Sequence, residues 1–441
     1  MQNQQFNKYP LNVAVIGAGH IGLVTAASFA QLGNQVVCVD NNSKKIDDLK
    51  KNKVTFYEPG LKDIVLRNKR AKSLTFSNSI KEATERSLVI FICVGTPSLP
   101  DGSTNLSAVQ RVALEIAKSI KEYKIIVEKS TVPAETGEKI KKIVEMNTPR
   151  KIDFDIVSNP EFLREGQALY DTFHPDRIIL GLESKKAEKI MRRLYSSINA
   201  PIIVTNTNTA EIIKHASNCF LTTKISYINA IANLCEKVNA DIAKVSEALG
   251  LDKRIGRNFL NAGAGFGGYC FPKDLNSFIH FAGEKGYDFE LLKAVRKINQ
   301  EQKMVIVKKI QESFWSLKGK RIGVLGLSFK PDTDDIRNSI AVDIIKILIQ
   351  AGADIKSYDP QAMPNAQKEL KDITFSKSAY DAARNSDCLV ILTEWREFRS
   401  LDLKKIKSLL RQPIIIDGRN IFNPEQMKQA GFIYKSIGRQ G

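Results

Sequence analysis

Residues 265–274 carry the side chains best suited to covalent chemistry. Glycines lead into Cys270, and Pro272, Lys273 and Asp274 follow it. Because Pro272 suits the first turn of a helix, we expect Cys270 at a helix N-terminus, where the helix dipole and Lys273 stabilise a thiolate. Asp274 shares the helix face of Cys270 and can handle a proton or a water molecule. The alternative is a buried cysteine that packs as a small hydrophobe, which suits the other five cysteines better.

A second reactive stretch runs from Asn159 to Glu165, directly after an apolar strand-like run. We expect a helix to start here with Asn159 as its cap. Glu161 and Glu165 are four residues apart and can point the same way. The alternative is that these carboxylates only favour the first turn of a helix.

A third set lies on a long helical segment, where Glu211, Lys214 and Asn218 fall on one stripe. A solvated helix face is the default interpretation of such a stripe. The alternative is that Lys214 and Asn218 hold an oxyanion or a sugar hydroxyl.

The segment Gly17–Gly22 reads Gly-Ala-Gly-His-Ile-Gly between a predicted strand and a predicted helix. Gly17 permits a tight turn, Gly19 lets the backbone approach a pyrophosphate, and Gly22 allows close helix packing. Asp40 ends the next strand at the distance typical of a carboxylate that binds the adenosine ribose. These residues predict a dinucleotide site, and the alternative is a glycine turn with a surface aspartate.

The carboxylate of Asp40 favours NAD over NADP, because it repels a 2′-phosphate. Lys44 and Lys45 weaken this argument, since they can hold a phosphate. A later strand end, Val324–Lys330, lacks the GxGxxG pattern, so we do not expect a second dinucleotide there. Lys330 can still face a nucleotide phosphate.

The elements that position these residues follow an α/β order, then an all-helical middle, then α/β again. This order predicts two doubly wound, Rossmann-like domains joined by a helical domain. The expected strands are 11–16, 35–39, 88–94, 124–128, 154–157, 177–180, 201–204, 321–325, 354–358, 388–392 and 413–416. The main expected helices are 21–32, 106–120, 135–146, 209–238, 241–249 and 339–350.

Bulk composition excludes several classes of protein. The 441 residues include 43% hydrophobic and 26% charged residues, which is typical of a globular protein. Residues 1–10 lack the apolar run of a signal peptide, and the longest apolar stretch, 88–94, is too short to span a membrane. Six scattered cysteines without a CxxC pair predict reduced thiols, a cytoplasmic location and no metal site. The net charge of +18 is spread along the chain, so we expect a solvated basic surface or a phosphate-rich substrate, and no nucleic-acid partner.

Taken together, these motifs resemble the UDP-glucose/GDP-mannose dehydrogenase family, along nearly the whole chain. The stretch 265–274 is the most specific part of the resemblance. The remaining motifs are the opening fingerprint, Tyr57–Leu61, Val94–Pro97, Ser130–Pro133, Asn159–Gly166, Phe329–Asp332, Thr393–Trp395 and Asp417–Arg419.

The resemblance implies three domains. Residues 1–206 would bind NAD, 207–317 would form a helical dimerisation domain that carries the catalytic cysteine, and 318–441 would bind the UDP-sugar. It also implies which residues contact each ligand. For NAD these are Gly17, Gly19, Gly22, Asp40, Lys45, Thr96, Thr131, Lys273 and Arg337. For the sugar nucleotide they are Glu161, Phe162, Leu163, Lys214, Asn218, Phe259, Gly265, Lys330, Arg419 and, across the dimer, Arg254.

The implied reaction is the four-electron oxidation of UDP-glucose to UDP-glucuronate. Either Lys214 or a water held by Asp274 and Thr131 removes the alcohol proton. Cys270 then forms a thiohemiacetal and a thioester, with Lys214 and Asn218 stabilising the oxyanion. Water activated by Glu161, or by Asp274 through Thr131, hydrolyses the thioester.

One residue departs from the family pattern, because Tyr269 precedes the cysteine where many relatives have a small residue. It can crowd the loop or add a hydroxyl near the sugar, which leaves UDP-N-acetylhexosamine and GDP-mannose as alternative substrates. A different class, a basic nucleic-acid-binding protein with a vestigial nucleotide fold, would need clustered basic and aromatic residues. No such cluster stands out in the sequence.

Overall fold

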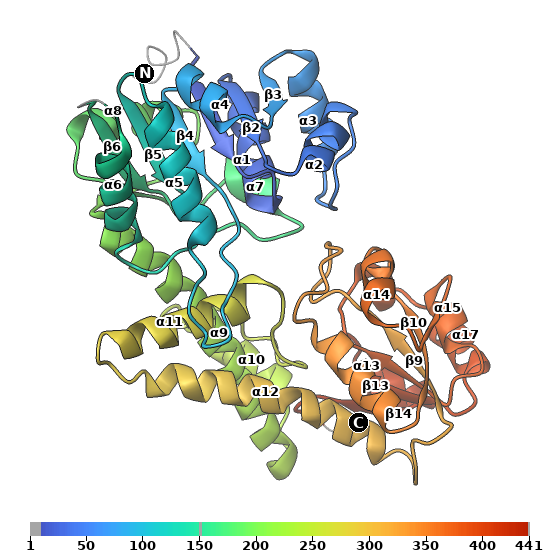
Figure 1. Ribbon diagram of the computed structural model, residues 1–441. Coiled ribbons are helices and arrows are strands. Elements are labelled where there is room, and N and C mark those ends of the chain that lie inside the picture. Colours follow the sequence, from blue (N-terminus) through green and yellow to red (C-terminus); the bar gives the residue numbers. More distant parts are fainter. Residues whose placement is uncertain (1–9, 150–151, 440–441) are drawn as a thin grey trace. The chain divides into compact units, whose positions relative to one another are not determined.

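The computed structural model describes residues 10–149 and 152–439, which form two compact units. The first unit contains residues up to 217 together with 276–281, and the second contains 218–275 and the residues from 282 onward. Figure 1 labels the elements of both units. Residues 1–9, for which the sequence predicts a polar start without a signal peptide, lie outside the described residues.

The first unit is built on an eight-stranded sheet with the order β3-β2-β1-β4-β5-β6-β7-β8. Side chains alternate along the strands, so Val13 and Val15 join one core cluster while Ala14 and Ile16 join another on the opposite face. The strands are β1 (Asn12–Ile16), β2 (Gln35–Val39), β3 (Leu74–Ser77), β4 (Val89–Ile92), β5 (Lys124–Glu128), β6 (Phe154–Ser158), β7 (Ile178–Gly181) and β8 (Ile202–Thr205).

Helices cover both faces of this sheet (Figure 1). Helices α4 (Ile80–Arg86), α5 (Ser107–Ser119) and α6 (Thr136–Asn147) pack on one face. The opposite face is covered by α1 (His20–Gln31), α2 (Ser43–Lys50), α3 (Leu61–Arg70), α7 (Ala168–Phe173) and α8 (Lys185–Leu194).

The expected parallel sheet is confirmed for β1 to β6 but not for the last two strands. β7 pairs antiparallel with β6 through Ser158 and Gly181, and β8 runs parallel to β7. Residues 159–167 and the short helix α7 lie in the connection from β6 to β7, which contains no long crossover helix.

The second unit contains a six-stranded parallel sheet with the order β11-β10-β9-β12-β13-β14. One of its faces is covered by α12 (Glu290–Gln311) and α13 and the other by α15 to α18. Its strands are β9 (Arg321–Leu325), β10 (Asp354–Tyr358), β11 (Thr374–Phe375), β12 (Cys388–Ile391), β13 (Ile414–Asp417) and β14 (Ile433–Ser436). Its helices are α13 (Ile340–Gln350), α14 (Met363–Glu369), α15 (Ala379–Ala383), α16 (Arg396–Arg399), α17 (Leu403–Leu409) and α18 (Pro424–Gln429).

Four helices form the middle of the chain, as the sequence predicts. Ile228, Ala232 and Cys235, from the C-terminal half of α9, pack into the core of the second unit. These helices are α9 (Thr207–Val238), α10 (Ile242–Leu251), α11 (Cys270–Glu284) and α12 (Glu290–Gln311). Within the described ranges, no helix combines the length and the apolar character that a membrane crossing requires.

Candidate active site

The glycine turn after β1 is shaped by two close approaches, at Gly17 and at Gly22. Gly17 has a φ of 108°, and a Cβ there would lie 2.3 Å from the Cys93 carbonyl oxygen. A Cβ on Gly22 would lie 1.8 Å from the Gly17 carbonyl oxygen, whereas a Cβ on Gly19 would meet nothing within 4 Å. No side chain caps the N-terminus of α1. The turn therefore leaves open space beside an uncapped, electropositive helix end, which fits a dinucleotide pyrophosphate.

Asp40 follows β2 at the edge where the turn lies. Its carboxylate accepts hydrogen bonds from the Ala18 backbone N (2.8 Å) and the Asn42 backbone N (2.9 Å), and it pairs with Lys45 Nζ at 2.9 Å. Burial alone would raise the pKa of Asp40, but the hydrogen bonds from Asn42, Lys45 and Ala18 hold this pKa below its usual value. Asp40 is thus an ionised acceptor beside the glycine turn, and Lys45 contacts it directly.

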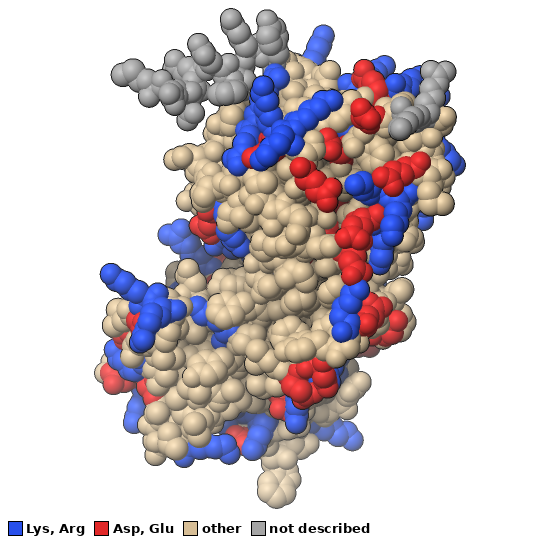
Figure 2. Space-filling view, turned by 90° about the vertical axis from the view of Figure 1, so that its left-hand side faces the viewer, with Lys and Arg blue, Asp and Glu red and all other residues tan. Residues whose placement is uncertain are grey.

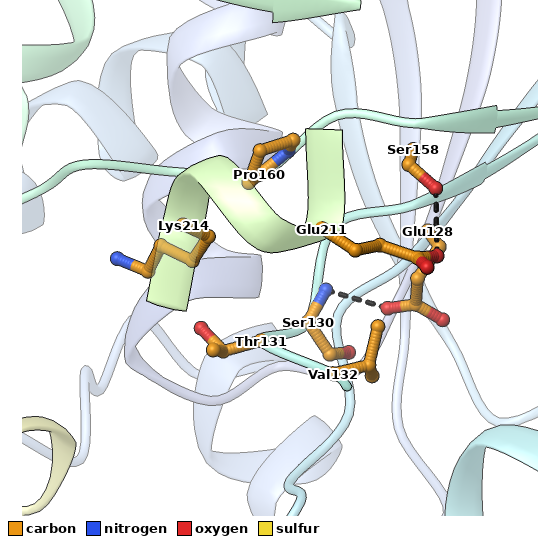
Figure 3. A pocket seen from close by; sticks show the side chains of 8 residues that line it. All are labelled: Glu128, Ser130, Thr131, Val132, Ser158, Pro160, Glu211 and Lys214. Atoms are coloured by element: carbon orange, nitrogen blue, oxygen red, sulfur yellow. Dashed lines mark hydrogen bonds between the residues drawn. The ribbon is translucent and has the colours of Figure 1, made fainter. Parts of the chain in front are cut away.

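A loop after β5 carries Thr131, whose backbone oxygen accepts a hydrogen bond from Thr96 Oγ1 at 2.9 Å. The loop and the first turns of α9 line a small cavity (Figure 3). Its lining residues are Glu128, Ser130, Thr131, Val132, Ser158, Pro160, Glu211 and Lys214.

Residues 159–167 form an irregular loop, so the expected helix with an Asn159 cap is wrong; helix α7 begins only at Ala168. The Asn159 side chain donates to the Ile179 carbonyl oxygen and accepts from Lys129 and Tyr195, so it is unavailable as a cap. Glu161 instead accepts from the Leu163 backbone N within the loop. Long-range contacts therefore overrule the local helix signal.

Glu161 and Lys214 form a buried ion pair, with 3.0 Å between Oε1 and Nζ and each side chain 5% exposed. The ring of Phe162 lies next to this pair, 5.3 Å from Lys214 Nζ, and the Arg177 guanidinium stacks on it at 3.9 Å. Removing two charges from water costs free energy, and this cost is offset only when the charges are paired with each other. The solvated interpretation of the Glu211, Lys214 and Asn218 stripe is therefore wrong, because all three are buried.

In the second unit, α11 begins at Cys270, as predicted. Cys270 is partly exposed, whereas the other five cysteines are buried. Burial raises the thiol pKa of Cys38, Cys93, Cys219, Cys235 and Cys388. The position and exposure of Cys270 are those of a reactive thiol.

A buried polar network lies one turn beyond Cys270. Asp274 is fully buried, its Oδ1 lies 2.6 Å from Lys273 Nζ, and its Oδ2 accepts from the Asn218 amide at 2.6 Å. The network joins the start of α11 to α9. A carboxylate held by a cation and an amide donor can orient water or pass a proton close to the thiol.

The glycine loop before Cys270 is held by the residues around it. Gly265 has a φ of 110°, and a Cβ there would lie 2.7 Å from Asn299 Oδ1. Asn299 bonds both the backbone N and the carbonyl oxygen of Phe266. Tyr269 packs its ring under the Arg337 guanidinium at 4.3 Å, so its ring has a defined partner in this loop.

The remaining predicted substrate residues lie in the second unit. Arg419 donates to the carbonyl oxygens of Leu392 (2.7 Å) and Gly265 (3.1 Å), so it braces the glycine loop. Phe259 has a φ of 65°, which is rare for a residue with a side chain. Lys330 is half-buried and the Arg254 side chain is 88% exposed.

The structure thus groups the predicted residues into two sets. The first unit contains the fingerprint glycines, Asp40, Lys45, Thr96, Thr131, Glu161, Phe162, Leu163 and Lys214. The second unit contains Asn218, Arg254, Phe259, Gly265, Cys270, Lys273, Asp274, Lys330, Arg337 and Arg419. Sequence reasoning missed Glu128 and Lys129. The available signal was their position at the carboxyl end of a buried apolar strand, since Glu128 ends β5 and Lys129 follows it. Ligands bind at this edge of the sheet in such folds.

In the described parts of the chain, no cluster of three or more His, Cys, Asp or Glu residues could hold a metal ion.

Known proteins resemble this chain over 97–98% of its length. It is 48% identical over 428 residues to UDP-glucose 6-dehydrogenase TuaD of Bacillus subtilis, which covers 97% of this chain and 93% of the relative. A solved UDP-glucose dehydrogenase from Pyrobaculum islandicum superposes with a TM-score of 0.92 at 36% identity, covering 98% of this chain and 99% of that one. A UDP-D-ManNAc dehydrogenase from Pyrococcus horikoshii superposes with a TM-score of 0.86 at 28% identity, covering 97% and 99%.

Three domain profiles of one family match consecutive parts of the sequence. The NAD binding domain matches residues 11–199, the central domain matches 208–301, and the UDP binding domain matches 323–424. Because these profiles span most of the chain, and because a 48% identical relative covers 97% of it, the chain belongs to the UDP-glucose/GDP-mannose dehydrogenase family.

Proposed function

We propose that this protein oxidises UDP-glucose to UDP-glucuronate with two equivalents of NAD. The observation that carries the proposal is Cys270, the partly exposed thiol at the start of α11, next to the buried Lys273, Asp274 and Asn218. The proposal is supported by relatives whose names state this activity at 48% and 36% identity.

The cofactor is held by the open glycine turn and by Asp40, with Lys45, Thr96, Thr131, Lys273 and Arg337 as further proposed contacts. Bound NAD supplies a hydride acceptor for each of the two oxidations. Asp40 favours NAD, because a 2′-phosphate would meet its carboxylate.

In the first oxidation, the C6 alcohol loses a hydride and a proton. The proton goes either to Lys214, which is already paired with Glu161, or to a water molecule held by Asp274 and Thr131. The product is an aldehyde, which stays on the enzyme.

In the second oxidation, the Cys270 sulfur adds to the aldehyde carbon and forms a thiohemiacetal. Loss of a hydride from that carbon and of a proton from its oxygen gives a thioester. Water activated by Glu161, or by Asp274 through Thr131, then breaks the carbon–sulfur bond and restores the thiol. Lys214 and Asn218 stabilise the oxyanion of these steps, a contact worth roughly 3–4 kcal/mol per donor.

The proposed contacts of the sugar nucleotide come from two parts of the sequence. Phe162 and Leu163 contact it from the 159–167 loop, and Phe259, Gly265, Lys330 and Arg419 contact it from the second unit. Residues 323–424 match the UDP binding domain of the family. Lys330 and Arg419 lie in this range, and their positive charges suit the diphosphate.

We also propose a homodimer formed through the helical middle, in a three-domain chain divided at about residues 206 and 317. Helix α9 carries Phe220, Tyr227 and Leu234 at seven-residue spacing, and these side chains are 64%, 54% and 54% exposed. Such a stripe of large apolar side chains buries itself against a second helix. The exposed Arg254 would then reach the substrate of the neighbouring subunit. A Phe220→Glu variant should sediment as a monomer, and a monomeric wild-type protein would contradict the dimer.

No disulfide joins any of the six cysteines, all of which lie in the described part of the chain, and the proposed chemistry needs Cys270 reduced. We therefore propose that the protein works in the cytoplasm, where thiols stay reduced. Nucleic-acid binding is not favoured, because Figure 2 shows Lys and Arg interspersed with Asp and Glu on the face that it draws.

The decisive experiment supplies purified protein with NAD and a panel of UDP-glucose, UDP-N-acetylhexosamines and GDP-mannose. We expect turnover of UDP-glucose with two NADH per sugar. A ratio of one NADH would contradict the two-step reaction, and preference for another sugar would correct the substrate. Cys270→Ser should trap an intermediate, and carboxylate formation by Cys270→Ala would refute the thioester route.

A further inference from the structure

Two carboxyl groups that the proposed mechanism does not use face each other in the cavity of Figure 3. Glu128 ends β5 and is 2% exposed, and Glu211 lies on the first turns of α9 and is 3% exposed. Each carboxyl group accepts hydrogen bonds through one of its two oxygens. Glu128 Oε1 accepts from the Ser130 backbone N at 2.6 Å, and Glu211 Oε1 accepts from Gly137 N and Ser158 Oγ, both at 2.9 Å.

The other two oxygens of the pair lack partners. Among the described residues, neither Glu128 Oε2 nor Glu211 Oε2 has a hydrogen-bond partner, and both atoms are buried. A buried ionised oxygen without a donor is costly, and two such oxygens around one cavity cost more because their charges repel. A single proton between the two carboxyl groups removes both costs.

The positive charges near the pair are committed elsewhere. Lys214 lines the same cavity but pairs with Glu161 at 3.0 Å. Lys129, the next residue after Glu128, donates a hydrogen bond to Asn159 Oδ1 at 3.1 Å. Burial raises the pKa of Glu128 well above its usual value, with the Glu211 charge adding to the effect. Burial also raises the pKa of Glu211 to about 7.

The pair connects the segments that carry two proposed catalytic residues. Through Ser130 N, Glu128 holds the residue next to Thr131. Glu211 lies one helical turn before Lys214 and ties α9 to the start of α6 and the end of β6. A bond between the two carboxyl groups would therefore set the Thr131 loop against the helix that presents Lys214.

We propose that Glu128 and Glu211 share one proton, directly or through a water molecule in the cavity, and that this hydrogen-bonded link, which carries a single negative charge, positions Thr131 and Lys214 for the dehydrogenase reaction. The catalytic part of the inference rests on the proposed function. Both glutamates are positioning residues, and neither touches the substrate.

The test uses the full-length protein with Glu128→Gln, Glu211→Gln and Glu211→Ala. An amide donates as the shared proton does, so each Gln variant should keep its kcat within about twofold at pH 7. The Glu211→Ala substitution leaves Glu128 without its partner. The kcat of this variant should fall about tenfold, while its KM values for NAD and for UDP-glucose stay within about threefold of the wild-type values. Glu138→Gln is the matched control, because Glu138 also joins α6 to α9, through Asn208, but at the surface.

A second measurement follows the Tm of the ligand-free protein from pH 5 to 8.5. The protonated pair belongs to the folded state, so the wild-type Tm should decline as pH rises through 7. Each Gln variant should show a flatter decline, and Glu138→Gln should follow the wild type.

Two outcomes would overturn the proposal. The first is a Gln variant as impaired in kcat as Glu211→Ala, since that would show a need for the ionised carboxylate. The second is a Gln variant with the wild-type dependence of Tm on pH, since that would show that no proton is shared. A wild-type protein without dehydrogenase activity would refute the proposed function and leave the Tm comparison to decide on the shared proton.

Discussion

The two doubly wound sheets begin with nearly the same turn and then use it differently. Gly17 follows β1 with a φ of 108° and donates to the Val39 carbonyl oxygen at 2.7 Å, and Gly326 follows β9 with a φ of 97° and donates to the Tyr358 carbonyl oxygen at 2.9 Å. An aspartate comes next after each second strand, Asp40 after β2 and Asp359 after β10.

The difference lies in what surrounds each aspartate. Helix α1 starts at His20, directly after the first turn, and Asp40 stays next to an uncapped helix end. In the second sheet α13 starts only at Ile340, and Asp359 is fully buried. Its donors are protein groups, namely the backbone N of Leu327, Ser328, Gln361 and Ala362, the Ser328 hydroxyl and the Trp395 indole.

The same turn and carboxylate can therefore be enclosed in the core or can remain beside an uncapped helix end, where a ligand is expected to bind. The indole of Trp395 lies 3.1 Å from Asp359 Oδ2 and donates to it, so the protein itself supplies a donor to that carboxylate. Asp40 instead accepts from two backbone N–H groups and Lys45, at the edge where the ribose hydroxyls are expected.

The largest effect is expected for Asp359→Ala. Its removal leaves several buried donors unpaired at about 1–3 kcal/mol each, so we expect a loss of about 4 kcal/mol or more in the free energy of unfolding. Urea unfolding followed by Trp395 fluorescence in a Trp315→Phe background measures it, since Trp395 is buried and Trp315 is exposed. Asp359→Asn keeps one acceptor oxygen and should lose less. A stable Asp359→Ala protein would show that the carboxylate is dispensable.

Alanine at either turn glycine should destabilise its unit by about 2–3 kcal/mol, because both positions have positive φ and little space. The new Cβ would lie 2.3 Å from the Cys93 oxygen at Gly17 and 2.4 Å from the Thr393 side chain at Gly326. Only Gly17→Ala should also abolish NADH binding, as measured by fluorescence titration. Equal NADH affinities in the two variants would remove the functional contrast between the turns.

Asp40→Ala should weaken NAD binding about 30-fold, which corresponds to about 2 kcal/mol, with a smaller effect on stability than Asp359→Ala. NADP should lose less affinity, or gain some, because a repelling carboxylate is removed while Lys45 remains. Calorimetric titration with both cofactors measures the ratio. An unchanged ratio of NAD to NADP affinity would refute the selecting role of Asp40.

The smallest effect is expected for Lys45→Met. Its ion pair with Asp40 is partly exposed, with 28% of the Lys45 side chain accessible, and such pairs contribute about 0.2–1 kcal/mol. Since the Lys45 hydrogen bond helps to lower the pKa of Asp40, this pKa should rise in the variant, as an NMR titration would detect. A larger loss of stability than in Asp40→Ala would show a separate structural role for Lys45.

Much of the fold could be predicted from local patterns. The strand–glycine–helix order predicted the turn at Gly17, and Pro272 together with the preceding glycines predicted a helix that begins at Cys270. The apolar periodicity of 209–238 predicted the long helix α9. In each case neighbouring residues carry the information, so the structure agrees with the prediction.

The errors arose where distant residues compete with local signals. Asn159 has the preferred residue type of a helix cap, yet Lys129, Tyr195 and the Ile179 carbonyl oxygen occupy its side chain. Lys214 and Glu211 are suited to a solvated helix face, yet Glu161 and Ser158 pair with them inside the protein. A single sequence does not state which of its charges will meet.

The sequence by itself therefore determined the order of the elements, the glycine turn, the helix start at the reactive cysteine and the kind of chemistry that these residues can perform. Only the tertiary structure decided the antiparallel direction of β7 and β8, the irregular loop that carries Glu161, and the burial of Glu128 against Glu211. The physical reason is that turns and helix ends depend on the conformations of adjacent residues, whereas strand direction and the protonation of buried groups depend on partners brought together by the fold.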